Sequence, residues 1–220
     1  MDSLKKNLQE RSSSWPKKHR GGKQLADVAQ GSRDTLEFHP LTSKNWADIE
    51  ELFGPRGGWG GCWCMWWRVG RSAFAKSKGN GNKQALRRIV ASGKLVGVLA
   101  YLAGKPVGWC AVAPREVYTR LANTRVLKPV DAQPVWSVSC FFVKPEYRRA
   151  GLTVALLKAA VDYAIENGAK IIEGYPQDAH KNLPDAFAWT GLLPTFCQAG
   201  FEEVARRSPR RPIMRKDVSA

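Results

Sequence analysis

The chain has 220 residues, 44% of them hydrophobic, and its 35 basic and 19 acidic side chains give a formal net charge of +16. This length predicts one domain with a sizeable core, and the positive charge favours acidic ligands such as a phosphorylated cofactor or nucleic acid. No apolar run approaches the roughly 20 residues of a membrane span, and five cysteines without an export signal predict a reduced, cytoplasmic protein.

Residues 1–33 differ in composition from the rest of the chain. Lysine and arginine are frequent there among Ser, Gln and Gly, and apolar residues are few and unpatterned. We interpret this segment as a basic, disordered N-terminal arm or extension, and residues 34–220 as a single folded domain. Two interpretations of the arm stay open: it makes weak contacts with a polyanion, or it is an extension without a role of its own.

The folded part begins with a predicted strand and helix. Residues 36–41 alternate apolar and polar side chains as a strand does, and Thr42 or Ser43 can cap a helix that runs to about Leu52. His39 stands beside a proline at the end of this strand, and we interpret it as structural.

An unusual stretch follows at Gly57–Arg68, which contains four glycines, two cysteines and four tryptophans. The Cys62-x-Cys64 pair has no second pair elsewhere, so we expect no metal site, and no neighbouring His or Lys favours a reactive thiol. The glycine-flanked aromatic side chains could bury a ligand or stack on a cation, although some of them must serve ordinary core packing.

The middle of the chain alternates helical and extended patterns. A helix is expected from Asn82 or Lys83 to about Ala91, and a short one over residues 115–123. Residues 95–102 and 106–113 are apolar runs joined by a Gly-containing turn, which predicts an antiparallel hairpin.

Residues 134–168 are the most informative stretch. Residues 135–143 are β-branched and aromatic and predict a buried strand, which Pro145 ends; from Leu152 a helical period of apolar residues runs to Gly168. The basic, glycine-containing turn between them could hold a phosphate, because the first turn of a helix leaves N–H groups unpaired at an electropositive end. The alternative is a plain strand-to-helix junction with solvated arginines. Neither a P-loop nor a Rossmann glycine pattern is present.

The remaining elements complete a sheet. Residues 170–176 predict a short strand, parallel to the previous one and reached by a right-handed crossover. A polar loop over residues 177–185 carries Asp178 and His180. A last helix is expected from Gly191 or Leu192 to Gln198, followed by strands over residues 201–206 and 212–216.

The central stretch resembles the acetyl-CoA-binding segment of the GCN5-related N-acetyltransferase (GNAT) superfamily. The family's V-x-P-x-[YF] link and [RQ]-x-x-G-x-[GA] turn correspond to Val143–Tyr147 and Arg148–Thr153. Thr153 departs from the usual Gly or Ala, yet its hydroxyl could reach a phosphate. The G-C-x-C-M-x-W-R stretch resembles a subgroup of the superfamily, and the likeness spans roughly Thr35–Asp217.

This resemblance implies an α+β fold (an α/β sandwich) with a mixed, mostly antiparallel central sheet, a splayed pair of parallel strands and flanking helices. It implies acetyl-CoA as co-substrate, with no metal. The implied donor-binding residues are Phe141, Phe142 and Val143 along the pantetheine, and Arg148, Arg149, Ala150, Gly151, Leu152 and Thr153 at the pyrophosphate. We expect Trp63, Trp66, Trp67 and Asp178 to bind the acceptor.

The groups that transfer protons are less evident. Counting along the family pattern, the usual glutamate falls on Ser137 and the usual tyrosine on Phe196, so both usual groups are missing. We consider Tyr175 as the acid, Glu173 on the same strand face as a group that steers water, Ser137 as a water relay and His180 in the following loop. Glu116, Asp178 and Cys197 are further candidates. A core tyrosine and a solvated histidine remain the ordinary alternatives for Tyr175 and His180.

The sequence therefore predicts an acetyl-CoA-dependent N-acetyltransferase that modifies a primary amine of a small molecule by direct attack in a ternary complex. The alternative is a GNAT module associated with nucleic acid or protein, either modifying RNA or protein or binding acyl-CoA without catalysis. A homodimer is left open by the sequence.

Overall fold

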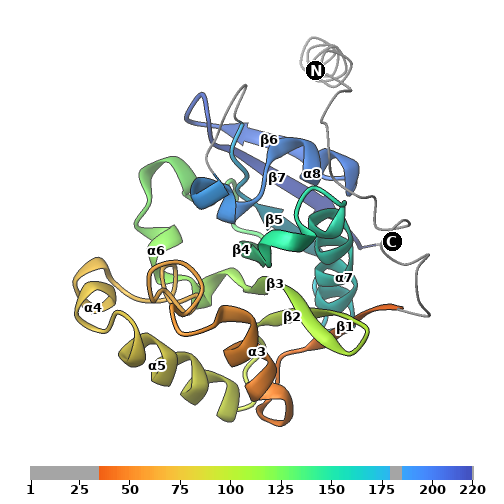
Figure 1. Ribbon diagram of the computed structural model, residues 1–220. Helices are drawn as coiled ribbons and strands as arrows, with labels where there is room; N and C mark the ends of the chain where they lie inside the picture. The colour runs from red at the N-terminus through yellow and green to blue at the C-terminus, as the bar shows by residue number, and fades with distance from the viewer. Residues whose placement is uncertain (1–34, 179–184, 220) are drawn as a thin grey trace.

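A single seven-stranded sheet forms the centre of the protein in a computed structural model, which describes residues 35–178 and 185–219 (Figure 1). The strands are β1 (Leu36–Pro40), β2 (Gly97–Leu102), β3 (Lys105–Pro114), β4 (Trp136–Val143), β5 (Ile171–Gly174), β6 (Glu202–Arg206) and β7 (Pro212–Asp217). Their order is β1-β2-β3-β4-β5-β7-β6, and β4 and β5 alone pair in parallel among them. The predicted mixed, mostly antiparallel sheet is confirmed. The expected N-terminal arm lies outside the described residues.

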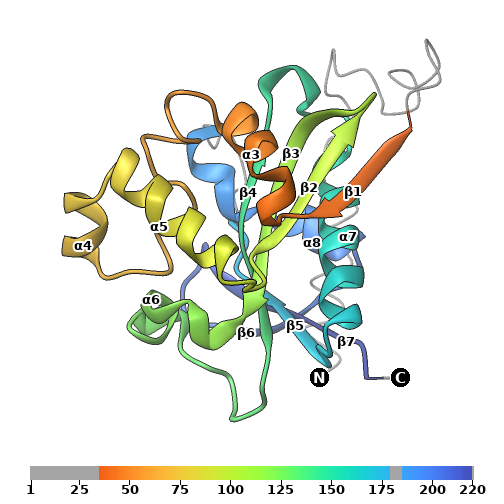
Figure 2. The same ribbon diagram turned by 90° about the horizontal axis from the view of Figure 1, so that it is seen from below.

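Helices cover both faces of this sheet. The α-helices are α3 (Trp46–Phe53), α4 (Arg71–Lys76), α5 (Asn80–Ala91), α6 (Thr119–Ala122), α7 (Leu152–Glu166) and α8 (Leu193–Gln198). Short 3-10 turns are η1 (Ser43–Asn45), η2 (Arg115–Val117), η3 (Arg125–Leu127), η4 (Pro145–Tyr147) and η5 (Asp185–Thr190). Figure 2 shows α7 and α8 on one side of the strands and α3 to α6 on the other. None of the helices in the described part of the chain is long and apolar enough to cross a membrane.

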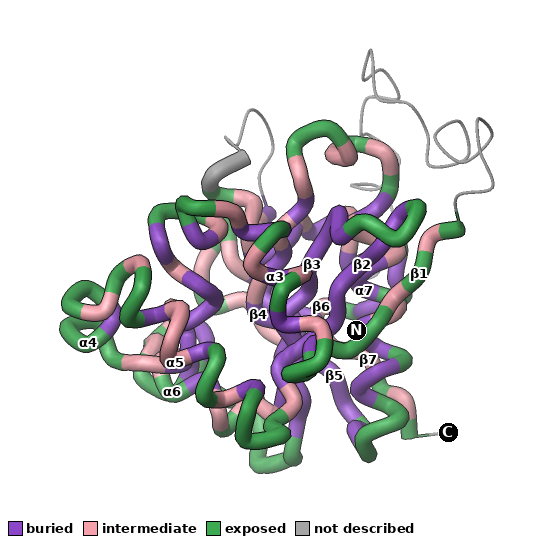
Figure 3. The backbone as a smooth tube through the Cα atoms, turned by 60° about the horizontal axis from the view of Figure 1, so that its bottom comes forward, coloured by how far each residue is buried: buried purple, intermediate pink, exposed green. Residues whose placement is uncertain are grey.

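The longest helix, α7, packs against the centre of the sheet through a row of apolar side chains. Leu152, Leu156 and Ala160 are fully buried in one core cluster with residues of β2, β3 and β4. Gly108 on β3 permits this close approach, because a Cβ atom there would lie 2.8 Å from Leu156 Cδ1. Burial of this kind, which Figure 3 shows along the strands and the inner side of α7, gives the strand-to-helix unit a rigid base.

The presence and the bounds of some helices differ from the sequence-based expectation, because tertiary contacts determine them. Helix α4 was not expected, because its six residues carry one buried side chain, Phe74, and too few apolar positions for a helical period. The helix expected over residues 115–123 is divided into η2 and α6. Helix α5 begins at Asn80, before the expected start, and its buried Asn82 side chain donates to the Gly61 carbonyl at 3.1 Å.

Candidate active site

The turn between β4 and α7 has the backbone geometry of an anion-binding turn. Gly151 caps α7 with φ 87°, in the left-handed region that glycine tolerates, and Arg149 also has a positive φ of 62°. Left-handed residues of this kind occur in the concave backbone turns that bind phosphates. The Arg148 side chain donates from Nε to the Val143 carbonyl at 3.0 Å, which fixes the turn against the end of β4.

Strands β4 and β5 separate partway along β4, ahead of this turn. They pair only from Trp136 to Val138 on β4, whereas β4 continues to Val143. The register between β3 and β4 shifts at the same point, where Ala111 faces Cys140 and Val112 faces Val138, so that Ser139 is an extra residue in β4. The bulge and the end of the pairing leave the last part of β4 without β5 as a neighbour.

The aromatic ring of Phe196 packs where β5 ends. A Cβ atom on Gly174 would lie 1.9 Å from Phe196 Cε1, and one on Gly191 would lie 2.7 Å from Phe196 Cε2. The ring is fully buried and meets Phe141 edge-on, with 6.1 Å between the centroids. Both glycines are therefore needed to seat this ring beside β4.

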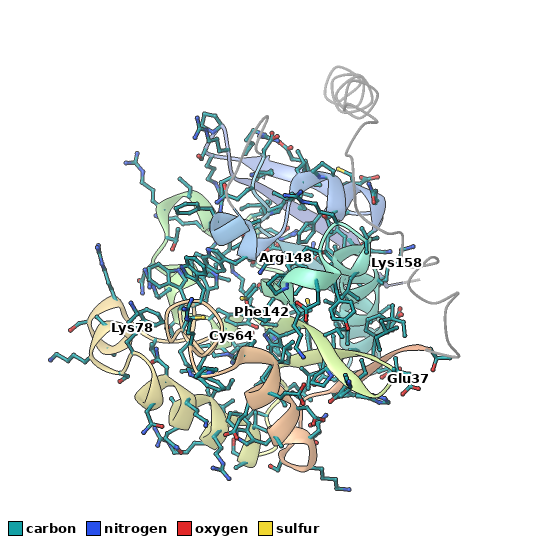
Figure 4. The ribbon with its side chains drawn as sticks, in the orientation of Figure 1. Glu37, Cys64, Lys78, Phe142, Arg148 and Lys158 are labelled. Carbon is teal, nitrogen blue, oxygen red and sulfur yellow. The ribbon has the colours of Figure 1, made fainter. Side chains whose placement is uncertain are left out.

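A cavity of about 320 Å³ opens on the α3–α6 side of β4. Its lining residues are Phe53, Gly58, Trp59, Gly60, Cys62, Cys64, Trp66, Trp67, Phe74, Lys78, Cys140, Phe141, Phe142, Phe187 and Trp189. They come from the end of α3, the stretch at 58–67, α4 and the turn after it, β4 and η5. Figure 4 labels Lys78, Cys64 and Phe142, which follow one another from the α4 side toward the central sheet. Three consecutive β4 residues, two of them predicted to bind the donor, thus border an aromatic cavity.

Two glycines of the segment at 57–61, Gly58 and Gly60, belong to the lining of this cavity. All four glycines of the segment, Gly57, Gly58, Gly60 and Gly61, have positive φ angles, which disfavour any other residue. A Cβ on Gly61 would lie 2.6 Å from the Gly79 backbone nitrogen, which donates to the Gly61 carbonyl at 3.0 Å. The segment is thereby held against the start of α5.

Two of the expected acceptor residues lie at the cavity and two do not. Trp66 and Trp67 line it; the Arg120 guanidinium lies 3.8 Å above the Trp66 ring, and the buried Trp67 Nε1 has no hydrogen-bond acceptor among the described residues. Trp63 instead packs in the core, stacked on Trp46 at 6.2 Å. Asp178 is ion-paired with Arg206 at 2.6 Å. Aromatic packing and the ion pair keep these two side chains off the cavity lining, and the acceptor contact expected for them stays a prediction.

Three cysteines on the lining differ in acidity. Burial raises the pKa of the Cys62 thiol to about 11. The pKa of Cys64 is lowered, because the Cys140 thiol and the Trp109 indole N–H, 3.0 Å away, donate to its sulfur. The pKa of Cys140 is raised well above its ordinary value, first by that hydrogen bond and then by burial. No local pattern predicted this contact, because Cys64 and Cys140 lie on distant segments of the chain.

Three of the four expected catalytic residues form one hydrogen-bonded network. The Tyr175 hydroxyl lies 2.7 Å from both Ser137 Oγ and Glu173 Oε2, and Arg115 NH1 also donates to the Tyr175 hydroxyl. Two arginines bind the carboxylate of Glu173, Arg115 at 2.9 Å and Arg215 at 2.8 Å. The fourth expected residue, His180, lies outside the described residues.

This network is sealed from solvent. Ser137, Glu173 and Tyr175 are at most 1% exposed, and none of them is among the residues that line the cavity. Burial raises the pKa of Tyr175 well above its ordinary value, and the neighbouring Glu173 adds to this effect, so the hydroxyl holds its proton firmly. The network joins β4 to β5 at the point where the two strands separate.

Comparison with known proteins gives one family. Residues 63–183, more than half of the chain, match the sequence profile of the acetyltransferase (GNAT) family. No curated protein shows significant sequence similarity.

Solved structures share the fold at low sequence identity. An acetyltransferase of the GNAT family from Listeria monocytogenes has a TM-score of 0.52 and 11% identity, with 83% of this chain and 95% of that chain covered. Arylalkylamine N-acetyltransferase 2 from Aedes aegypti has a TM-score of 0.51 and 13% identity, with 84% and 99% covered. An aminoglycoside N-acetyltransferase in complex with CoA has a TM-score of 0.50 and 16% identity, with 80% and 93% covered.

Proposed function

Because the chain belongs to the acetyltransferase (GNAT) family, we propose that it transfers the acetyl group of acetyl-CoA to the primary amine of a small molecule. The observation that carries this proposal is a spatial one. The left-handed turn before α7, the end of β4 that lacks β5 as a neighbour, and an aromatic cavity bordered by Cys140 to Phe142 adjoin one another.

The donor fits this arrangement in its chemistry. The pyrophosphate of acetyl-CoA is an anion, and the residues at 148–153 offer main-chain N–H groups at the start of a 15-residue helix together with the positive charge of Arg149. The pantetheine arm carries amides that pair with a strand edge, and β4 lacks β5 as a neighbour beyond Val138. The acetyl thioester would then lie beside Phe141 and Phe142, at the wall of the cavity.

Transfer proceeds by attack of the amine on the thioester carbonyl in a ternary complex. A main-chain N–H of β4 stabilises the negative charge that develops on the carbonyl oxygen. An amine with a pKa near 10 must first lose a proton. No carboxylate or imidazole is present among the described lining residues, so we assign that proton to water.

A thermal melt with and without acetyl-CoA tests the donor site. At a hundred times the dissociation constant, one-site binding adds about 2.7 kcal/mol, which raises the Tm of a domain of this size by roughly 5 to 10 °C. The Gly151→Val variant should lose this rise, because a β-branched residue disfavours φ 87°. No rise for the unaltered protein at millimolar acetyl-CoA would overturn the proposal.

A further inference from the structure

The lining of the aromatic cavity has an unusual charge balance. Nine of its fifteen residues are aromatic, and Lys78 is the one charged side chain among them. No aspartate or glutamate lines the cavity within the described residues. A polycationic acceptor would therefore bring a second positive charge into an apolar space without a carboxylate to compensate for its lost hydration.

Two large apolar side chains at the cavity are exposed to solvent. Trp59 is 69% exposed and Phe187 is 58% exposed, although both belong to the lining. They come from segments far apart in the sequence, the glycine-rich segment and η5. Exposed aromatic side chains that border one cavity are typical of a surface that is covered when an apolar ligand binds. These features favour a ligand with an apolar body, and a volume of about 320 Å³ accommodates one ring system of the indole or phenyl type.

Lys78 supplies the complementary charge. Within the described residues it forms no ion pair. The backbone around it is fixed, because the amide of Gly79 donates to the Gly61 carbonyl at 3.0 Å. On the same lining, the indole N–H of Trp67 is buried and lacks an acceptor. A carboxylate on the ligand would form a charge-assisted hydrogen bond with Lys78.

We propose that the acceptor is an aromatic α-amino acid or a close analogue, with a primary amine and one carboxylate on a single-ring or indole body. This inference rests on the proposed acetyl transfer and specifies its substrate class. Lys78 binds the carboxylate, and the aromatic lining buries the ring. The positive charge of Lys78 also disfavours spermidine-like and aminoglycoside-like acceptors by repulsion.

Matched pairs of amines test the proposed acceptor class. Tryptophan and tryptamine, and phenylalanine and phenethylamine, differ only by the carboxylate; spermidine and kanamycin represent polycations. Acetylated products are measured by chromatography and mass spectrometry at saturating acetyl-CoA. We expect kcat/KM to be about tenfold or more higher for the amino acid of each pair, the effect of one charge-assisted hydrogen bond. Higher turnover of the decarboxylated amines or the polycations would overturn the inference.

Variants separate the role of Lys78 from general effects of charge. Lys78→Met should abolish the preference within each pair, because the amino acids lose the charge-assisted hydrogen bond to their carboxylate. Lys76→Met is the matched control, because Lys76 is exposed two residues away and does not line the cavity. Trp59→Ala, at an exposed position, should raise the KM of both indole acceptors together. A preference that survives in Lys78→Met would refute the assignment of the carboxylate.

Failure of the acceptor class and failure of acetyl transfer give different results. If acetyl-CoA raises the Tm and only spermidine or kanamycin is acetylated, or none of the six amines is, the acceptor class is wrong and the donor site stands. If acetyl-CoA leaves the Tm unchanged and no amine is acetylated, acetyl transfer itself is wrong, and the acceptor class falls with it.

Discussion

The Tyr175→Phe variant distinguishes a structural role of the buried network from a catalytic one. The hydroxyl lies 2.7 Å from Ser137 Oγ and 2.7 Å from Glu173 Oε2, and its removal leaves the Ser137 hydroxyl without a partner in the described structure. A buried polar group left unpaired costs about 1–3 kcal/mol. For a domain of this size that lowers the Tm by roughly 2–12 °C.

We expect Tyr175→Phe to lower the Tm by this amount while kcat with the best acceptor stays within about twofold. Two features favour this outcome: the hydroxyl does not line the cavity, and its raised pKa makes it a poor proton donor to the CoA thiolate. Tyr163→Phe is the matched control, because Tyr163 is also buried but no hydrogen bond of its hydroxyl is recorded in the described structure. An unchanged Tm with a kcat that falls a hundredfold would refute the structural role and restore Tyr175 as the acid.

Three further variants test other parts of the structure. Gly174→Ala should destabilise the protein by about 1–3 kcal/mol in urea unfolding, because its Cβ would lie 1.9 Å from the buried Phe196 ring; an unchanged midpoint would contradict the packing. Arg149→Gly should raise the Tm slightly by relieving the positive φ of 62°, while weakening acetyl-CoA binding in a titration through the lost charge; tighter binding would contradict the placement of the pyrophosphate. Burial raises the pKa of the Cys62 thiol from 9.0 to about 11, so the folded state favours the protonated thiol. The stability that this thiol contributes is fully present below pH 9 and is lost as the pH rises toward 11. Cys62→Ala should flatten that decline by up to about 3 kcal/mol, and an equal slope in both proteins would refute the assignment.

The strand-to-helix unit could be predicted from local sequence. The apolar run to Val143, the proline that ends it, and the helical period after Leu152 each act over a few residues, and β4 and α7 follow them closely. A glycine-containing turn before the helix was expected for the same reason, and the structure adds that Gly151 is left-handed, with φ 87°. These elements carry the donor-binding prediction, and the matched family profile covers them.

The acceptor side depended on contacts between distant segments. The four tryptophans look alike in sequence, but Trp66 and Trp67 line the cavity whereas Trp63 packs against Trp46 in the core. Lys78, Phe187 and Trp189 carried no local signal, because each is one side chain in a short turn or helix that other segments position. The pairing of Glu173 with Arg115 likewise joins residues 58 positions apart.

The difference in predictability between the strand-to-helix unit and the cavity has a physical reason. Backbone propensity, helical period and turn chemistry are set by neighbours in the chain, so the sequence by itself determined the strand, the helix and the turn between them, and the family resemblance that this stretch carries implied the fold class. The chemistry of the cavity depends on which side chains share a space and which charges are compensated there. Only the tertiary structure decided this, because it brings the glycine-rich segment, β4 and η5 together around a single lysine.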